Sequence, residues 1–274
     1  MQKELQDKKA DLTHIPGAEP SARIDAWWWL VVGVVALIIM MVVTSPDPYM
    51  RILIFVRDGI WVTLYVTVLS FLFTLVLGLI GGLGRLSKNR VIYSISTLYV
   101  ELIRGIPLMV QLIWWYFAFP VMLQSIGRSL NLPALSNYQA SALPMAVMGL
   151  TFCYGAYMSE IYRAGIQSIP DGQMEAAKSL GMNYFKAMRF IILPQAIRMI
   201  MPPMGNEFIA LLKDSSLVSV VAVADLTRRG REFMSTNFTP IEVWNLVALI
   251  YLTMTLFSAR VVSRIEKATK AVER

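Results

Sequence analysis

Six long apolar runs, separated by short polar stretches, constrain the fold of this chain more strongly than any other feature of its sequence. They cover approximately residues 27–43, 52–84, 92–123, 142–164, 195–223 and 241–259. A helix of about 20 apolar residues crosses a lipid bilayer, and in lipid a helix satisfies its own backbone hydrogen bonds. With 56% hydrophobic and 16% charged residues, the sequence predicts an all-α integral membrane protein with six spans.

The first apolar run is the shortest of the six. It opens with Trp27, Trp28 and Trp29, and tryptophan favours the membrane–water interface. A helix lying in the interface would need a polar face, which this run lacks. We therefore predict a transmembrane helix here. The residues before it are charged and show no apolar periodicity, which predicts a flexible tail.

Lys and Arg residues are unevenly distributed over the two sides of the six spans. If the N-terminus lies inside, the two termini, the loop around residues 85–90 and the loop between the fourth and fifth spans hold 16 of the 25 basic residues. The three opposite loops hold 7. Because cytoplasmic loops carry the excess of Lys and Arg, we predict that both termini are cytoplasmic. Anionic headgroups of the lipid bilayer account for the net charge of +7, so no nucleic-acid partner is expected.

Several charged residues lie inside the apolar runs, where they are costly unless they face a cavity, a partner or each other. Glu101 and Arg104 are three residues apart on one helix face, so one interpretation is an internal ion pair. Pro107 should kink the same helix. Glu160 and Arg163 repeat the three-residue spacing.

The fifth apolar run is the least regular. Pro202 and Pro203 interrupt it, and Glu207, Lys213 and Asp214 follow. This pattern predicts a bent or broken helix beside a water-accessible cavity, where freed backbone groups can be satisfied. The next stretch, up to the sixth run, is basic and is expected to be a loop.

The stretch between the fourth and fifth runs is polar and alanine-rich. Asp171 is the expected N-cap of a short helix, and Glu175 in its first turn complements the helix dipole. Gly181 permits a left-handed turn, Asn183 can cap a second short helix, and Pro194 should end it. The stretch therefore predicts a bent helix pair at the membrane surface.

The same stretch contains a spaced motif, Glu-Ala-Ala, three residues, Gly, nine residues, and then Ile-x-Leu-Pro. Its fixed positions are filled by Glu175, Ala176, Ala177, Gly181, Ile191, Leu193 and Pro194. The motif resembles the EAA loop of permease subunits of ABC-type importers, in which this helix pair docks in a groove on the ATPase subunit. The resemblance implies that Glu175, Ala176, Ala177, Gly181 and Pro194 couple this chain to an ATPase. An ordinary amphipathic loop helix is the alternative interpretation.

Three further segments, at residues 99–111, 159–173 and 208–220, are similar to the polar amino acid branch of these permeases, the histidine, glutamine, arginine and glutamate uptake group. This similarity implies an importer of polar amino acids in the bacterial cytoplasmic (inner) membrane. Because only these segments favour polar amino acids, a permease for another small solute stays open as the alternative within the transporters.

The resemblance also implies a domain layout. A flexible cytoplasmic tail at 1–26 and an added transmembrane helix at 27–45 precede the five-helix core of a type I ABC importer permease. That core covers 52–265 and contains the coupling loop at 168–194. A cytoplasmic C-terminal tail covers 266–274.

The resemblance further implies partners. These are a cytoplasmic ABC ATPase dimer, a second permease subunit that is identical or homologous, and a periplasmic or extracytoplasmic binding protein that delivers the amino acid. The sequence contains no glycine-rich phosphate loop of the Walker type. ATP and Mg are therefore expected to bind to the ATPase subunit. We expect that this chain is not an enzyme and holds no cofactor.

A zwitterionic substrate needs an anionic group for its ammonium and donors for its carboxylate. On charge grounds Glu160, Glu207 and Arg104 are the candidates for the substrate pathway, with structural ion pairs as the alternative. Lys213 and Asp214 could pair with each other or shape the outer gate.

Two other protein classes are less consistent with the sequence. The sequence has a single histidine, His14, and a single cysteine, Cys153. These are too few residues for a histidine-based metal site, a histidine-containing catalytic triad or an internal disulfide. This argues against a membrane-embedded enzyme and predicts no metal site. A passive channel or structural subunit would explain the helices and the buried charges but not the coupling motif.

Overall fold

The computed structural model describes residues 26–270, and all regular secondary structure in this part of the chain is helical, without a strand. The helices are α2 (Ala26–Thr44), α3 (Pro46–Arg85), α4 (Arg90–Gly105), α5 (Leu108–Ile113), η1 (Trp114–Ala118), α6 (Phe119–Ser129), α7 (Pro133–Ser136), α8 (Ala142–Gln167), α9 (Asp171–Ser179), α10 (Tyr184–Ala187), η2 (Met188–Ile192), α11 (Leu193–Asp214), η3 (Ser215–Val221), α12 (Leu226–Asn237) and α13 (Pro240–Lys270). The predicted tail at 1–26 lies outside the described residues except for Ala26.

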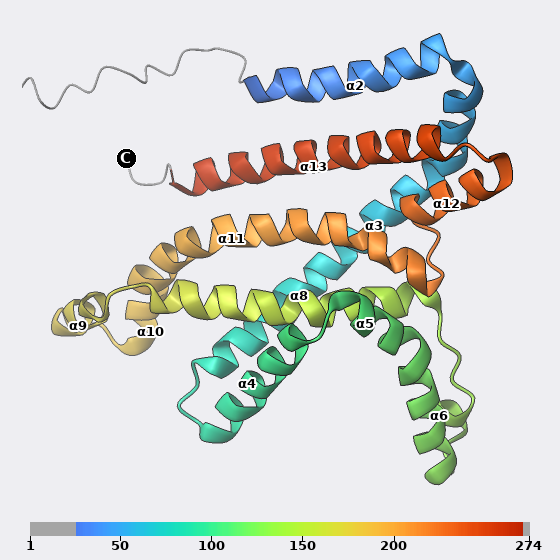
Figure 1. Ribbon diagram of the computed structural model, residues 1–274. Coiled ribbons are helices and arrows are strands. Elements are labelled where there is room, and N and C mark those ends of the chain that lie inside the picture. Colours follow the sequence, from blue (N-terminus) through green and yellow to red (C-terminus); the bar gives the residue numbers. More distant parts are fainter. Residues whose placement is uncertain (1–25, 271–274) are drawn as a thin grey trace, which may run out of the picture.

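The long helices form one bundle (Figure 1). α11 packs between α8 and α13, α2 packs on the other side of α13, and α3 crosses behind this layer. α9 and α10 project at one end of the bundle, and α12 lies at the opposite end (Figure 1). This arrangement places the predicted coupling helices and the basic stretch before α13 at opposite ends of the molecule.

Within residues 26–270, five helical segments are long and apolar enough to cross a membrane. They are Trp27–Thr44, Pro46–Arg85, Leu108–Ser129, Ala142–Gln167 and Pro240–Thr269. α11, which contains most of the predicted fifth span, is not among them. Its sequence includes Arg198, Asn206, Glu207 and Lys213, which lower its hydropathy. The predicted C-terminal tail at 266–274 begins inside α13, which is helical up to Lys270.

The bundle is built around the contact between α3 and α8. These two helices are the most buried of the five candidate spans. Glycines of α3 lie against the backbone of α8. A Cβ added at Gly78 would lie 2.6 Å from the Cβ of Met158, and one added at Gly82 would lie 2.9 Å from the carbonyl oxygen of Ser159. Small residues allow two helices to approach this closely in a membrane.

Replacing Gly78 with leucine should therefore push α3 and α8 apart. Overpacking costs about 1–3 kcal/mol, and we expect a lower thermal midpoint of the complex in detergent. Gly33→Leu in α2 is the matched control, because a Cβ at Gly33 meets nothing within 4 Å. Equal midpoints for the two variants would contradict close packing at Gly78.

The third apolar run is two helices rather than one kinked helix. α4 ends and α5 begins on either side of Ile106 and Pro107, which are extended. Proline disfavours helical backbone in the preceding residue, so the helix stops before it. Gln111 Nε2 donates to the carbonyl oxygens of Ile103 and Ile106, each at 2.8 Å, and so satisfies groups that a helix end leaves free. The prediction of a single kinked span over 92–123 is wrong.

Two five-residue π-turns, η1 and η2, each come directly before a helix with proline as its second residue. In η2 the N–H of Leu193 bonds to the carbonyl of Met188, five residues earlier, and Pro194 follows. η1 precedes Pro120 in the same way. A proline ring clashes with the carbonyl four residues earlier in a regular helix, and a π-turn widens the helix at that point. Pro194, which was predicted to end the second short helix, therefore lies within a continuous path from α10 to α11.

The fifth run is broken, as predicted, but not at its prolines. α11 stays helical through Pro202 and Pro203. The regular helix ends at Asp214 and continues as the 3₁₀-helix η3, and Ala222 then adopts a left-handed φ of 63°. Proline inside a helix is tolerated within a membrane bundle.

The basic stretch before the sixth run is a helix, α12, rather than the predicted loop. Asp225 caps its N-terminus and accepts hydrogen bonds from the N–H groups of Thr227 and Arg228 at 3.1 and 3.0 Å. Aspartate at this position is a preferred N-cap. α12 packs on α3 and α13.

Candidate functional site

The predicted coupling stretch forms a helix hairpin. Pro170 occupies the N-cap position of α9, so Asp171 is the first helical residue and Glu175 the fifth, and the prediction of Asp171 as N-cap is wrong. Gly181 has a φ of 80°, which confirms the left-handed turn. The Oδ1 atom of Asn183 accepts the N–H of Lys186 at 2.9 Å, which confirms the cap of the second helix.

The motif residues divide between the inside and the outside of this hairpin. Ala177 is buried at 3% exposure, whereas Glu175, Ala176, Gly181 and Pro194 are exposed. α9 packs against η2. Ala177 thus lies inside the hairpin, and Glu175 and Ala176 present an outer face to any partner.

Sequence reasoning missed an apolar patch on the same hairpin. Leu180 is 80% exposed, Tyr184 63%, Phe185 70% and Phe190 62%. Large exposed apolar groups at a turn favour contact with another surface. Their large apolar side chains, in an otherwise polar stretch close to Gly181, were visible in the sequence.

A cluster of ion pairs joins α3, α4 and α8. The Arg85 guanidinium lies 2.8 Å from Glu160 and 3.5 Å from Glu101. Arg163 also binds Glu160, with its Nε atom 2.9 Å from Oε2. The expected pairing of Glu160 with Arg163 is therefore confirmed. Glu101 pairs with Arg85 and not with Arg104, because the closest guanidinium comes from α3 rather than from its own helix.

Glu160→Gln should destabilise the bundle. The Arg85 side chain is only 12% exposed. If Glu160 loses its charge, the only carboxylate of residues 26–270 still paired with Arg85 is Glu101, which lies farther away. We expect a loss of about 1–3 kcal/mol, between the effects measured for exposed and for buried pairs. Thermal unfolding of the complex measures this loss. Asp47→Asn, in a pair with Arg51 that is 61–74% exposed, is the control and should change the midpoint little.

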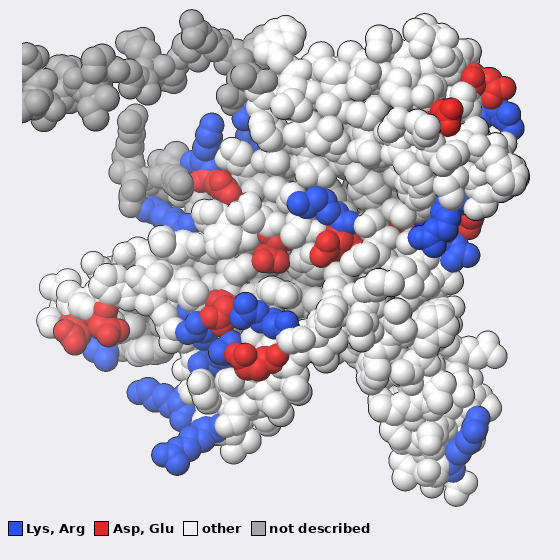
Figure 2. All heavy atoms as spheres, in the orientation of Figure 1, with Lys and Arg blue, Asp and Glu red and all other residues white. Residues whose placement is uncertain are grey.

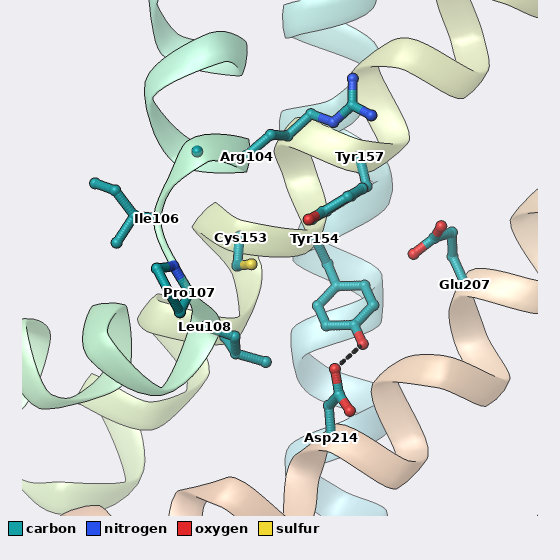
Figure 3. Close-up of a pocket in the computed structure, with 10 residues that line it drawn as sticks. Arg104, Ile106, Pro107, Leu108, Cys153, Tyr154, Tyr157, Glu207 and Asp214 are labelled. Carbon is teal, nitrogen blue, oxygen red and sulfur yellow. Dashed lines mark hydrogen bonds between the residues drawn. The ribbon is translucent and has the colours of Figure 1, made fainter.

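A polar cavity of about 410 Å³ lies between the α4–α5 break, α8 and α11 (Figure 3). Its lining consists of Arg104, Gly105, Ile106, Pro107, Leu108, Cys153, Tyr154, Tyr157, Glu207 and Asp214. On the face shown in Figure 2, acidic and basic side chains gather over the middle of the molecule, whereas most of the surrounding surface is white. Two of the three predicted pathway residues, Arg104 and Glu207, therefore line one cavity.

Helical spacing explains why these side chains meet. Glu207 and Asp214 are seven residues apart on α11, and Tyr154 and Tyr157 are three apart on α8, so each pair lies on one helix face. Arg104 lies in the last turn of α4, directly before the break. The chain therefore leaves the helical path of α4 directly after Arg104, whose guanidinium lines the cavity.

Short contacts fix the walls of the cavity. The Tyr154 hydroxyl donates to Asp214 Oδ2 at 2.8 Å, as the dashed line in Figure 3 shows. The central carbon of the Arg104 guanidinium lies 5.1 Å from the centroid of the Tyr157 ring, within cation–π range. Lys213 is exposed and does not line the cavity, and within residues 26–270 it forms no ion pair with Asp214.

The third predicted pathway residue, Glu160, does not line this cavity. Its described contacts are the ion pairs with Arg85 and Arg163, so its contact with substrate stays a prediction. Cys153 is buried, and its Sγ atom accepts a hydrogen bond from Gln111 Nε2 at 3.6 Å. Across residues 26–270, no group of three His, Cys, Asp or Glu side chains could hold a metal ion.

Comparison with known proteins gives consistent matches. Residues 74–271 match the family described as binding-protein-dependent transport system inner membrane component. The chain is 35% identical to the glutamine transport system permease protein GlnP of Escherichia coli (strain K12), over 78% of this chain and 92% of that protein. It is 40% identical to the L-cystine transport system permease protein TcyB of Bacillus subtilis (strain 168), over 68% of this chain and 73% of that protein.

A solved structure is also similar. The crystal structure of an amino acid ABC transporter with histidines matches with a TM-score of 0.70 and 36% identity, over 82% of this chain and 97% of that chain. The match therefore extends to nearly the whole of the related chain.

Proposed function

The chain belongs to the family of binding-protein-dependent transport system inner membrane components, and from this premise we propose that the charged cavity is the path of the transported amino acid and that the α9–α10 hairpin docks on the ATPase. As a member, the chain is a multi-pass permease subunit of an ABC-type amino acid importer. ATP is hydrolysed by a separate subunit.

The observation that carries the pathway proposal is the combination of charges in one cavity. Arg104 can bind the α-carboxylate of an amino acid, and Glu207 or Asp214 can bind its ammonium. Relatives of similar identity are named for glutamine and for cystine, so overall identity does not select the substrate. The polar amino acid class follows from family membership, and the cavity supplies groups that match a zwitterion.

The coupling proposal places the docking surface on the exposed face of the hairpin. Glu175 and Ala176 would contact the ATPase directly, while Ala177, Gly181 and Pro194 would hold the shape of the hairpin. The exposed side chains of Leu180 and Phe185 support this assignment, since both are at least 70% exposed here. Closure of an ATPase dimer around ATP and Mg would then move the hairpins and rock the spans.

The remaining partners follow from the same mechanism. A binding protein outside the cytoplasm delivers the amino acid. A second permease subunit, identical or homologous, completes the pathway, and the lipid bilayer covers the other apolar faces. The exposed groups Leu102, Val110 and Trp114 around the α4–α5 break are available to the second subunit or to lipid.

We further propose six spans with both termini in the cytoplasm. α11 is the sixth, because its 22 residues extend about 33 Å at 1.5 Å per residue and it packs beside α8 and α13. The core at 52–265 then contains five spans, and the helix at 27–45 is an N-terminal addition. The excess of basic residues on the side of α9 supports this orientation.

Reconstituted uptake tests the proposed function. The permease is purified with its ATPase, placed in proteoliposomes with ATP inside, and supplied outside with its binding protein and labelled polar amino acids. Accumulation should require both ATP and the binding protein. Amino acid entry that needs no ATP would indicate a passive channel, and purification without any ATPase would contradict the coupling role.

A further inference from the structure

Two arginines of α13 converge on one tryptophan of α2. The central carbons of the Arg260 and Arg264 guanidinium groups lie 5.7 and 5.6 Å from the centroid of the Trp28 ring, within cation–π range. The neighbouring Trp27 donates its Nε1–H to the carbonyl oxygen of Leu256 at 3.5 Å. The start of α2 and the last turns of α13 therefore form one basic, aromatic site.

This site lies at the level of the lipid headgroups. From Pro240, where α13 begins, to Arg260 the helix rises about 30 Å at 1.5 Å per residue, which equals the thickness of the hydrocarbon core. Trp28 lies at the start of the apolar segment Trp27–Thr44, and tryptophan favours the interface. Both helix ends lie at the end of the bundle that carries α9 (Figure 1), which is the cytoplasmic end in the proposed orientation.

The charge of Arg264 is available to an anion. Its side chain is exposed, and within residues 26–270 it forms no ion pair with Asp or Glu. Glu266 lines a separate apolar pocket between α11 and α13, on another face of α13. The ring of Trp28 attracts a cation but carries no net charge, so it orients the Arg264 guanidinium without neutralising it.

Apolar side chains continue the site toward the middle of the membrane. Phe257 is 57% exposed and Val261 is 41% exposed. They precede Arg264 by seven and three residues, so all three lie on one face of α13. A guanidinium binds phosphate through two parallel hydrogen bonds, and the apolar groups beside it can contact an acyl chain. A phospholipid would use both parts of this surface, whereas a free phosphate ion would use only the first.

We propose that Arg260 and Arg264 bind the headgroup phosphate of an anionic phospholipid and that Trp28 orients them. Basic pockets between transmembrane helices bind such headgroups, and side chains that are already oriented lose less entropy on binding. Trp28 belongs to α2, which precedes the residues 74–271 that match the family. The site is therefore an addition to the family core, and it gives the added helix a role in lipid binding.

Binding of labelled phosphatidylglycerol to the purified permease–ATPase complex in detergent tests this proposal. The wild-type complex should bind the label saturably, and phosphatidylcholine, whose headgroup has no net charge, should not compete. Arg264→Gln should weaken binding about 10-fold or more, and Arg264→Lys should recover part of the loss. Trp28→Leu, which keeps both arginines, should weaken binding about 2- to 5-fold.

Arg90→Gln, which removes an exposed arginine at the start of α4, is the matched control and should change the affinity by less than about 2-fold. Equal losses in Arg264→Gln and Arg90→Gln would indicate general attraction to basic surfaces and would overturn the site. Wild-type affinity in Arg264→Gln would also overturn it. Displacement of the label by inorganic phosphate as efficiently as by unlabelled phosphatidylglycerol would overturn the phospholipid as the occupant.

Discussion

Replacing Glu175 with lysine should abolish coupled uptake while the complex still hydrolyses ATP. Glu175 lies on the outer face of α9, exposed and free of the packing that buries Ala177, so the hairpin should fold as before. Reversing a charge at a docking surface places like charges together or removes a partner, which costs a few kcal/mol. We expect uptake in proteoliposomes to fall by about 10-fold or more, measured beside the ATPase rate of the same preparation.

The control for this variant is Glu242→Lys. It makes the same charge change at the start of α13, at the end of the bundle away from α9 (Figure 1). Uptake by this control should stay near the wild-type rate. Normal uptake by Glu175→Lys would remove Glu175 from the docking surface.

Arg104→Gln should have the second large effect. The guanidinium is the one cation among the groups that line the cavity, and a hydrogen bond to a charged group contributes about 1.5–3 kcal/mol. Its loss should lower substrate affinity by about 10- to 100-fold, measured as the substrate concentration that half-saturates uptake. Arg104→Lys should recover only part of this, because an ammonium cannot form the two parallel bonds of a guanidinium.

Arg128→Gln, in the last turn of α6, is the matched loss of one arginine outside the cavity and should leave uptake unchanged. If Arg104→Gln and Arg128→Gln behave alike, with intact assembly in both, the α-carboxylate is bound elsewhere.

Local features of the fold could be predicted because their causes lie within a few residues. Gly181 takes the left-handed turn and Asn183 caps the next helix, since both effects depend only on neighbouring backbone. The same locality explains the pairing of Glu160 with Arg163, three residues apart on one face.

Long-range partners could not be predicted from spacing. Glu101 pairs with Arg85 on α3, and Asp214 accepts from Tyr154 on α8, sixty residues earlier. A helical spacing rule considers only residues on the same helix, so it favoured Arg104 for Glu101. The cavity itself depends on the break after Arg104, which required the extended backbone before Pro107 rather than a kink.

Two other predictions, each based on the residue types in a segment, were wrong. The basic content of the stretch before α13 suggested a loop, although Asp225 was positioned to cap a helix there. Pro194 suggested a helix end, although a π-turn accommodates it and lets the hairpin join α11 directly. That junction matters for the mechanism, because a movement of α9 and α10 can then pass through one helical path to Glu207.

The most direct measurement is the ATPase rate of the purified complex in nanodiscs, with its binding protein, across a panel of polar amino acids. The predicted result is stimulation by one ligand class, lost in Glu175→Lys. An ATPase that copurifies but responds to none of the amino acids would contradict the proposed pathway from substrate to hairpin.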